Sequence, residues 1–280
     1  MRTIVQLSDL HFGAILAPTL EPLVQYLHAL QPDLTIVSGD LTQRARISQF
    51  AQAKAYLSRL PSPQLVIPGN HDVPLYDVIR RFAAPFARYD RYIASNHNPV
   101  FIDDEIAVVG VNSARSFTFK GGKLTDEAVQ NAARHFDALH GQVRVVVTHH
   151  PFDIPVGLSG VTIVKGANAA VRAFAACDVD LFLTGHLHLV HRAPATVFVK
   201  DYHAELLVAG TATSTRARGE PNSFYVFHID HSRQDDTCIA IETHSWNAAR
   251  NCFERTATRS APRTSTVSED AYGQGNGITA

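Results

Sequence analysis

The sequence predicts an α/β fold: a four-layer α/β/β/α sandwich in which two mixed sheets pack face to face and helices cover the outer faces. Two observations lead to this prediction. The first two-thirds of the chain alternates short β-branched runs with longer segments of helical periodicity. The part after His188 contains strand-like runs and turns without helices. Strands with helices, followed by strands alone, are typical of two packed sheets whose outer faces carry helices.

The first elements are three short strands and two amphipathic helices. Thr3–Leu7 is an apolar run with the length of a buried strand, and apolar residues between Leu20 and Leu30 then recur at helical spacing. The same signals predict, in order, a strand at Thr35–Val37, a helix at Ile47–Leu60 and a strand at Leu65–Ile67.

The middle of the chain continues the alternation. Thr125 can cap a helix that begins with Asp126-Glu127, because its hydroxyl oxygen can accept a hydrogen bond from the first turn. Val143–Val147 has the most strand-like composition in the protein. Further predicted elements are strands at Val100–Ile102, Ile106–Val111 and Leu181–Leu183 and a helix at Ala169–Ala176.

The C-terminal part is predicted to be all strand, ending in a polar tail. The expected strands are Thr196–Val199, Leu206–Val208, Phe224–Ile229 and Cys238–Thr243. From Thr256 to Ala280 the chain is rich in Ser, Thr and Gly and has almost nothing to bury, which predicts disorder. We therefore expect one domain over residues 1–255 and a disordered tail over 256–280.

The charge balance argues against a nucleic-acid partner. The 280 residues carry a formal net charge of −1, and the pI is near 6.9. A chain without a basic field lacks the electrostatic attraction that drives sequence-independent binding to nucleic acid. The composition is compatible with an oligomer.

Cysteine usage predicts a reducing compartment. Cys177, Cys238 and Cys252 are far apart, and an odd number of cysteines cannot all pair within one chain. No apolar run is long enough to span a bilayer. We therefore expect a cytoplasmic protein with no membrane span.

Five polar clusters each follow directly on a predicted strand. They are Asp9-Leu10-His11, Gly39-Asp40, Gly69-Asn70-His71-Asp72, His149-His150-Pro151 and Gly185-His186-Leu187-His188. The loops that leave the carboxyl ends of strands in such a fold converge on one edge. The sequence therefore predicts that these clusters share one small volume at the carboxyl ends of the strands.

The residue types in these clusters suit a dinuclear metal site. Carboxylate and amide oxygens combined with imidazole nitrogens fit divalent or mixed-valence Mn, Fe, Zn or Co. One carboxylate can bridge two ions, and two ions about 3.5–4 Å apart can clamp the attacking and leaving oxygens of a phosphoryl displacement. Glycines beside Asp40, Asn70 and His186 allow the chain to turn sharply without a Cβ clash.

The ordered set D-x-H, G-D, G-N-H-D, H-H-P and G-H-x-H resembles the calcineurin-like metallophosphoesterase superfamily over roughly the first 190 positions. The resemblance implies a bridging Asp40 and a non-ligand His71 that contacts phosphate and assists the leaving oxygen. It also implies that the ligand is His149 rather than His150. The implied ligands are Asp9, His11, Asp40 and His188 for the first metal, and Asp40, Asn70, His149 and His186 for the second.

Details of the motifs resemble the cyclic 3′,5′-AMP phosphodiesterase-like (class III) group. The segments DLH at Asp9–His11, GDLT at Gly39–Thr42 and PGNHD at Pro68–Asp72 match that group and differ from protein phosphatases. The expected function is hydrolysis of a small phosphodiester, such as a cyclic nucleotide or a glycerophosphodiester, by a metal-bridging hydroxide that attacks phosphorus in line. The alternatives are a phosphomonoesterase or pyrophosphohydrolase of the same fold, and a non-catalytic scaffold.

Other residues have two open interpretations. Asn112 and Arg115 could contact phosphate or form a surface turn, and Arg44 and Arg46 raise the same question. The segment Phe152–Lys165 could be a lid, a substrate wall or a packed surface loop. His150 is interpreted as a neighbour that shapes the pocket.

Overall fold

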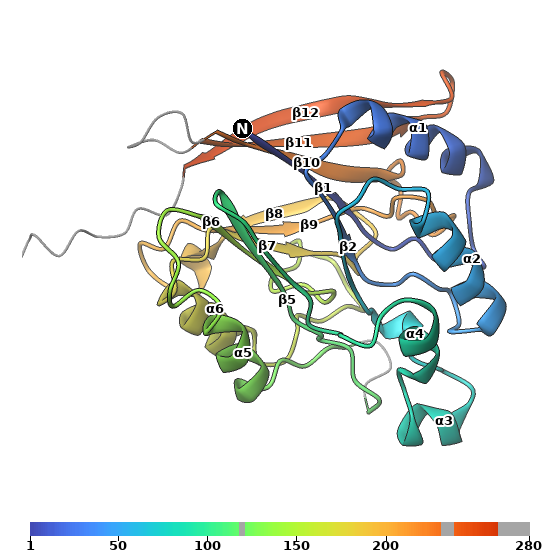
Figure 1. Ribbon diagram of the computed structural model, residues 1–280, viewed down its shortest axis with the longest axis horizontal. Coiled ribbons are helices and arrows are strands. Elements are labelled where there is room, and N and C mark those ends of the chain that lie inside the picture. The colour runs from blue at the N-terminus through green and yellow to red at the C-terminus, as the bar shows by residue number, and fades with distance from the viewer. Residues whose placement is uncertain (118–120, 231–237, 263–280) are drawn as a thin grey trace, which may run out of the picture.

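The computed structural model describes residues 1–117, 121–230 and 238–262. Within them, twelve strands form two six-stranded mixed sheets, as predicted (Figure 1). The first sheet has the order β12-β11-β10-β1-β2-β3, and the second has the order β4-β5-β6-β7-β9-β8.

The first sheet contains strands from both ends of the described chain. Its strands β1, β2 and β3 are parallel, and β10 pairs antiparallel with β1. The bounds are β1 (Arg2–Leu7), β2 (Leu34–Ser38), β3 (Gln64–Ile67), β10 (Ser223–Asp230), β11 (Cys238–Asn247) and β12 (Cys252–Pro262).

The second sheet has a parallel centre with antiparallel edges. Strands β5, β6, β7 and β9 run parallel, while β4 and β8 pair antiparallel at the two margins. The bounds are β4 (Val100–Ile102), β5 (Ile106–Gly110), β6 (Val143–Val147), β7 (Leu181–Thr184), β8 (His191–Pro194) and β9 (Glu205–Val208).

Helices cover the outer faces of both sheets. Figure 1 shows α1 and α2 beside the first sheet and α5 and α6 beside the second. The bounds are α1 (Leu20–Leu30), α2 (Ile47–Leu57), α3 (Val78–Ala83), α4 (Ala87–Tyr92), α5 (Asp126–Ala133) and α6 (Ala167–Ala175), with short 3-10 turns at Ala17–Thr19, Asn70–Asp72 and Ala195–Val197. None of the helices in the described ranges combines the length and the apolar character that a bilayer crossing demands.

Alternating side chains build three hydrophobic layers. In β6, Val145 and Val147 face the core between the sheets, whereas Val146 packs under α5 and α6 with Phe174. The cluster under α1 and α2 includes Phe50. Because successive strand residues point to opposite faces, a strand buried on both faces reads as a continuous apolar run. This explains why the central strands were predicted correctly.

The strands that follow β7 in the sequence are divided between the two sheets. Strands β8 and β9 complete the second sheet, whereas β10, β11 and β12 extend the first. The predicted strand at Thr196–Val199 is wrong: Ala195–Val197 is a 3-10 turn and the strand lies earlier, at His191–Pro194. The β-branched Val197 is 62% exposed there, so pairing of β8 with β9 overrides its strand propensity.

Several boundaries also differ from the prediction. The cap at Thr125 is confirmed, since its side chain accepts from the Ala128 amide, but α5 already ends at Ala133. Strand β12 runs through Thr256 to Pro262, so ordered structure passes the predicted domain boundary at residue 255. The rest of the predicted tail, residues 263–280, lies outside the described residues.

The helix-facing side of the second sheet provides a stability test. Phe182 is fully buried and its ring contacts those of Phe152, Phe174 and Tyr202. Phe182→Ala should lower the free energy of unfolding by about 3–5 kcal/mol, because the removed ring leaves a cavity. Urea titration checks this, with exposed Val197→Ala as the control. An equal, small loss in both variants would contradict the assignment of Phe182 to the core.

Candidate metal centre

The five predicted clusters meet at one end of the sandwich. They follow β1, β2, β3, β6 and β7, whose carboxyl ends lie together because these strands are parallel within each sheet. The loops hold one another through backbone contacts: the Asp9 amide donates to the Gly39 carbonyl at 3.1 Å, and the Gly185 amide donates to the His149 carbonyl at 3.0 Å. The prediction that the five clusters share one small volume is therefore confirmed.

The backbone at this end is strained. Ten non-glycine residues have positive φ in the described ranges, and half of them belong to the predicted ligand set. These five are Asp9, His11, Asp40, His186 and His188. Such conformations cost about 1–3 kcal/mol each and persist only where the surrounding structure enforces them. Their concentration here indicates a functional constraint on side-chain placement.

Two glycines allow the loops to approach closely. A Cβ atom at Gly69 would lie 2.2 Å from Asp40 Oδ1, and one at Gly185 would lie 1.8 Å from Ser8 Oγ. Neither distance is physically possible. The predicted Cβ clash beside Asn70 and His186 is therefore confirmed, but at Gly69 it arises from close approach of another loop to extended backbone and not from a sharp turn.

The first group of donor atoms consists of two carboxylates and two imidazoles. His188 Nε2 lies 3.1 Å from Asp9 Oδ1 and 3.0 Å from His11 Nε2. His11 Nε2 lies 3.6 Å from Asp40 Oδ2. All four side chains are buried, and their donor atoms are close enough to surround one ion.

The second group lies on the other side of Asp40. His149 Nε2 is 3.4 Å from Asp40 Oδ2 and 3.2 Å from Asn70 Oδ1. His186 Nδ1 is 3.3 Å from His149 Nε2, and a ring nitrogen of His150 is also within reach of this group. The arrangement could therefore hold a second ion.

Asp40 is common to the two groups. Its Oδ1 accepts from the His71 amide at 2.8 Å, while its Oδ2 faces both His11 and His149. Asp40 Oδ2 and Asp9 Oδ1 are buried and accept no hydrogen bond among the described residues. Buried carboxylate oxygens without partners are costly, so the structure fits cations at these positions.

The imidazole tautomers support the same conclusion. His149 Nδ1 lies 2.8 Å from the Ser38 carbonyl, and His188 Nδ1 lies 2.9 Å from the Arg216 carbonyl. A carbonyl oxygen can only accept, so each Nδ1 is the donor and each Nε2 can present a lone pair. In both residues that lone pair is directed toward carboxylate oxygen, an arrangement that a cation would make favourable.

The pKa shifts in the site indicate that anionic carboxylates lie among imidazoles. Burial alone would raise the pKa of Asp40, but the charges of His149 and His71 outweigh it and hold that pKa well below its usual range. Burial lowers the pKa of His11 to about 4 and that of His186 to about 3, so both imidazoles are neutral at pH 7. Burial opposes protonation of His149, yet Asp40 raises its pKa to about 9, and metal binding would displace that proton.

Asp72 links two of the motif loops. Its carboxylate accepts from the amides of Gly69, Leu41 and Thr42 at 2.9–3.1 Å. Burial and the nearby Asp40 raise its pKa to about 7. Asp72 therefore positions the loops that carry Asp40 and Asn70, a role that the sequence analysis did not assign.

His71 lies at the solvent side of the centre. Its ring stands edge-on to that of His11, with centroids 4.9 Å apart. Nδ1 donates to the Gln43 carbonyl at 2.8 Å, and Nε2 faces Arg216 NH1 at 3.0 Å. The ring is thus next to the first donor group without belonging to it.

The other arginines named from the sequence make local contacts. Arg115 NH1 donates to the carbonyls of Asn112 and Ala114, and burial lowers its pKa. The Asn112 side chain accepts from the Ala114 amide, so both residues stabilise their own turn. Arg44 stacks over Tyr76, and Arg46 precedes α2 as its N-cap.

The segment Phe152–Lys165 is attached at both ends. Phe152 and Val164 are buried in the cluster under α5 and α6, whereas Val156 between them is fully exposed. The Lys165 amide donates to the Gly122 carbonyl at 2.9 Å. The two ends of the segment are therefore packed, whereas its middle is exposed.

One loop of the site was missed. The polar run Thr211–Arg216 follows β9, which is parallel to β7 and therefore ends at the same edge. Thr211 Oγ1 donates to the Asp9 carbonyl at 2.7 Å, and Arg216 reaches His71. The rule that loops converge at carboxyl strand ends would have identified this run, but the run contains no carboxylate or histidine that signals metal binding.

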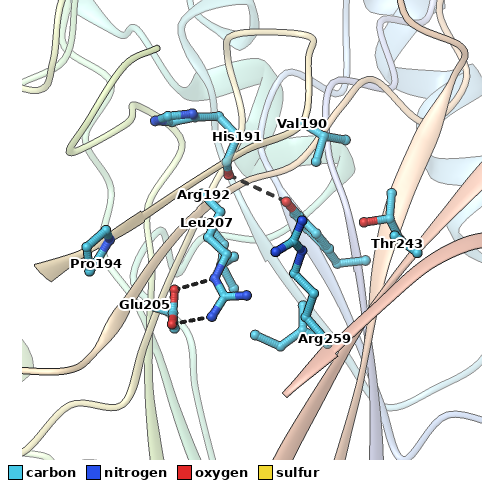
Figure 2. A pocket seen from close by; sticks show the side chains of 11 residues that line it. Val190, His191, Arg192, Pro194, Glu205, Leu207, Thr243 and Arg259 are labelled. Atoms are coloured by element: carbon cyan, nitrogen blue, oxygen red, sulfur yellow. Dashed lines mark hydrogen bonds and ion pairs between the residues drawn. The ribbon is translucent and has the colours of Figure 1, made fainter. Parts of the chain in front are cut away.

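A groove of about 590 Å³ lies between the β8–β9 edge and the strands β10–β12. Figure 2 shows Arg192 and Glu205 paired with each other on its wall. The Tyr225 hydroxyl donates to the His191 main-chain carbonyl. None of the predicted metal ligands lines it. The groove is therefore separate from the metal centre.

Comparison with known families agrees with the geometry. A family model described as calcineurin-like phosphoesterase matches residues 2–190, which include all five motifs. A probable glycerophosphodiester phosphodiesterase of Arcobacter nitrofigilis is 28% identical over 122 residues, or 43% of this chain and 42% of that protein. A probable cyclic nucleotide phosphodiesterase of Synechococcus is 28% identical over 81 residues, or 26% of this chain and 32% of that protein. This chain thus matches less than half the length of either relative.

The architecture is also found in a purple acid phosphatase from yellow lupin, Lupinus luteus. The two structures superpose with a TM-score of 0.72 over 94% of this chain and 54% of the lupin chain, at 13% identity. Identity this low supports the fold alone.

Metal content tests the two donor groups. Asn70→Ala and Asp9→Asn should each lower the content from about two ions per chain to about one, and Asp40→Asn should remove both, because only Asp40 serves both groups. Elemental analysis after Mn²⁺ loading and dialysis measures this, with exposed Asp104→Asn as the control. Retention of both ions by Asp40→Asn would contradict the shared position of Asp40.

Proposed function

This chain belongs to the calcineurin-like phosphoesterase family, and from that premise we propose that it is a dinuclear metal-dependent phosphodiesterase. The substrate class we propose is a small phosphodiester, such as a cyclic nucleotide or a glycerophosphodiester. The observation that carries the proposal is Asp40 Oδ2, a buried oxygen without a hydrogen bond between two groups of metal-binding side chains.

The ligands we propose are those that the motifs predicted. Asp9, His11, Asp40 and His188 would hold one ion, and Asp40, Asn70, His149 and His186 the other. When bound, the ions would activate water near neutral pH and neutralise charge on the phosphate. Divalent or mixed-valence Mn, Fe, Zn or Co fits this mixture of oxygen and nitrogen donors.

The chain's own residues then position the reaction. Asp9 Oδ2 accepts from Ser8 Oγ at 2.6 Å and from the His186 amide at 2.9 Å, which fixes the carboxylate rotamer. The His71 ring is held by the Gln43 carbonyl on one side, so its Nε2 faces the space beside the first group. From there His71 would contact the phosphate. To assist the departing oxygen its Nε2 must carry a proton, so its contact with the Arg216 NH1 donor would first have to open.

The preference for diesters is supported by the motifs and by the two relatives named as probable phosphodiesterases. A phosphomonoesterase or pyrophosphohydrolase of the same fold is the alternative. A non-catalytic scaffold is less well supported, because the donor groups are intact and buried. The three widely separated cysteines, which cannot all pair within one chain, support the proposal of a cytoplasmic location.

Substrate choice tests the proposal directly. After Mn²⁺ reconstitution, the protein should hydrolyse an aryl phosphodiester faster than the matching monoester, and turnover should be lost in Asn70→Ala. 3′,5′-Cyclic AMP assayed alongside distinguishes the cyclic nucleotide class from other diesters. Turnover of the monoester alone would agree with the proposed metal site but would contradict the proposed substrate class.

The role of His71 has its own test. His71→Ala should lower kcat for the diester by roughly 10²–10⁴-fold, the usual contribution of a general acid. Its metal content should not change, because His71 is not proposed as a ligand. Exposed His140→Ala is the matched control. If KM rises and kcat stays constant, His71 binds the substrate without assisting the leaving group.

A further inference from the structure

Arg216 brings a positive charge to the edge of the metal centre. Its NH1 donates to His71 Nε2 at 3.0 Å and lies 3.4 Å from Gln43 Oε1. In the described part of the chain, its Nε and NH2 groups have no hydrogen-bond partner and no carboxylate pairs with it. The side chain is half-buried. A planar cation with unused donors therefore faces the space beside His71.

The backbone of Arg216 is fixed by the site itself. Its carbonyl accepts from His188 Nδ1 at 2.9 Å, and its amide donates to Ser214 Oγ at 3.1 Å. Thr211 and Thr213 anchor the preceding residues by donating to the carbonyls of Asp9 and Leu10 at 2.7 and 3.0 Å. The loop Thr211–Arg216 is thus attached to the loop that carries Asp9. Arg216 and the first donor group are consequently held in one rigid unit.

A purely structural role explains little of this arrangement. An arginine that only braced His71 and Gln43 would use two of its five N–H groups and leave a half-buried charge without a counter-ion. Arg192, another partly buried arginine, is neutralised by Glu205. The missing counter-ion at Arg216 indicates an anion that arrives with the substrate. Guanidinium groups suit phosphate because two parallel N–H groups can reach two of its oxygens.

We propose that Arg216 binds a non-bridging phosphate oxygen of the substrate, on the His71 side of the metal centre. This inference rests on the proposed phosphoesterase function, since it places the reacting phosphate between the two donor groups and His71. Arg216 then gives the site a fixed positive charge that does not depend on metal loading. Gln43 holds the guanidinium at the correct edge of the pocket.

Binding of inorganic phosphate tests the contact without requiring turnover. Calorimetry on the Mn²⁺-loaded protein should give a Kd about 10-fold to 100-fold higher for Arg216→Gln than for the wild type, as expected for loss of a charge-assisted contact. Arg216→Lys should recover part of the affinity, because it restores the charge but not the planar donor pair. Arg172→Gln on the outer helix α6 removes one arginine far from the site and should leave the Kd unchanged.

Two controls separate this inference from its alternatives. Metal content and melting temperature of Arg216→Gln should equal those of the wild type, because only the Arg216 carbonyl contacts His188. In Arg216→Ala, added guanidinium chloride should partly restore the hydrolysis that the variant loses. The inference would be overturned if the phosphate Kd of Arg216→Gln lay within about twofold of the wild-type value. It would also be overturned if the weaker phosphate binding were caused by loss of metal. If phosphate binding depends on Arg216 but the protein does not hydrolyse diesters, the proposed substrate class is wrong and the inference about Arg216 stands.

Discussion

The buried negative charge of Asp9 and Asp40 is the constraint on which the rest of the structure depends. Each carboxylate directs one oxygen at imidazole nitrogens and accepts no hydrogen bond there among the described residues. Such a pair is stable in a protein interior only if positive charge is supplied nearby. Asp40 raises the pKa of His149 to about 9 against the effect of burial, so a proton on His149 can supply part of this positive charge. The same position is where a metal ion would bind.

The fold supplies the rigidity that such a site requires. Parallel strands from two separate sheets end together, so five loops from distant parts of the chain supply ligands to one volume. Left-handed backbone at Asp9, Asp40 and His186 turns each side chain inward, and Asp72 ties the second motif loop to the third. The strain is tolerated because apolar layers on both sides of each sheet hold the strand ends in place.

The proposed metal ligands and the proposed substrate contacts come from different kinds of loop. The proposed ligands lie in loops rich in carboxylate, amide and imidazole groups, which are visible as motifs. His71 and Arg216, the groups proposed to contact the substrate, are held by the main-chain carbonyl and the side-chain amide of Gln43.

The sequence by itself determined the central strands, the first two helices and the candidate residues that meet at one end of the sandwich. Those features are local: apolar periodicity marks a strand such as Val143–Val147, and ligand chemistry marks a residue such as Asp40. Tertiary structure decided which sheet β10–β12 would join, the 3-10 turn at Ala195–Val197 and the position of Arg216. The joining of β10 to β1 and the Arg216–His71 contact depend on partners more than a hundred residues away, whereas the turn depends on the pairing of β8 with the nearby β9. Neither kind of pairing leaves a periodic signal in the sequence.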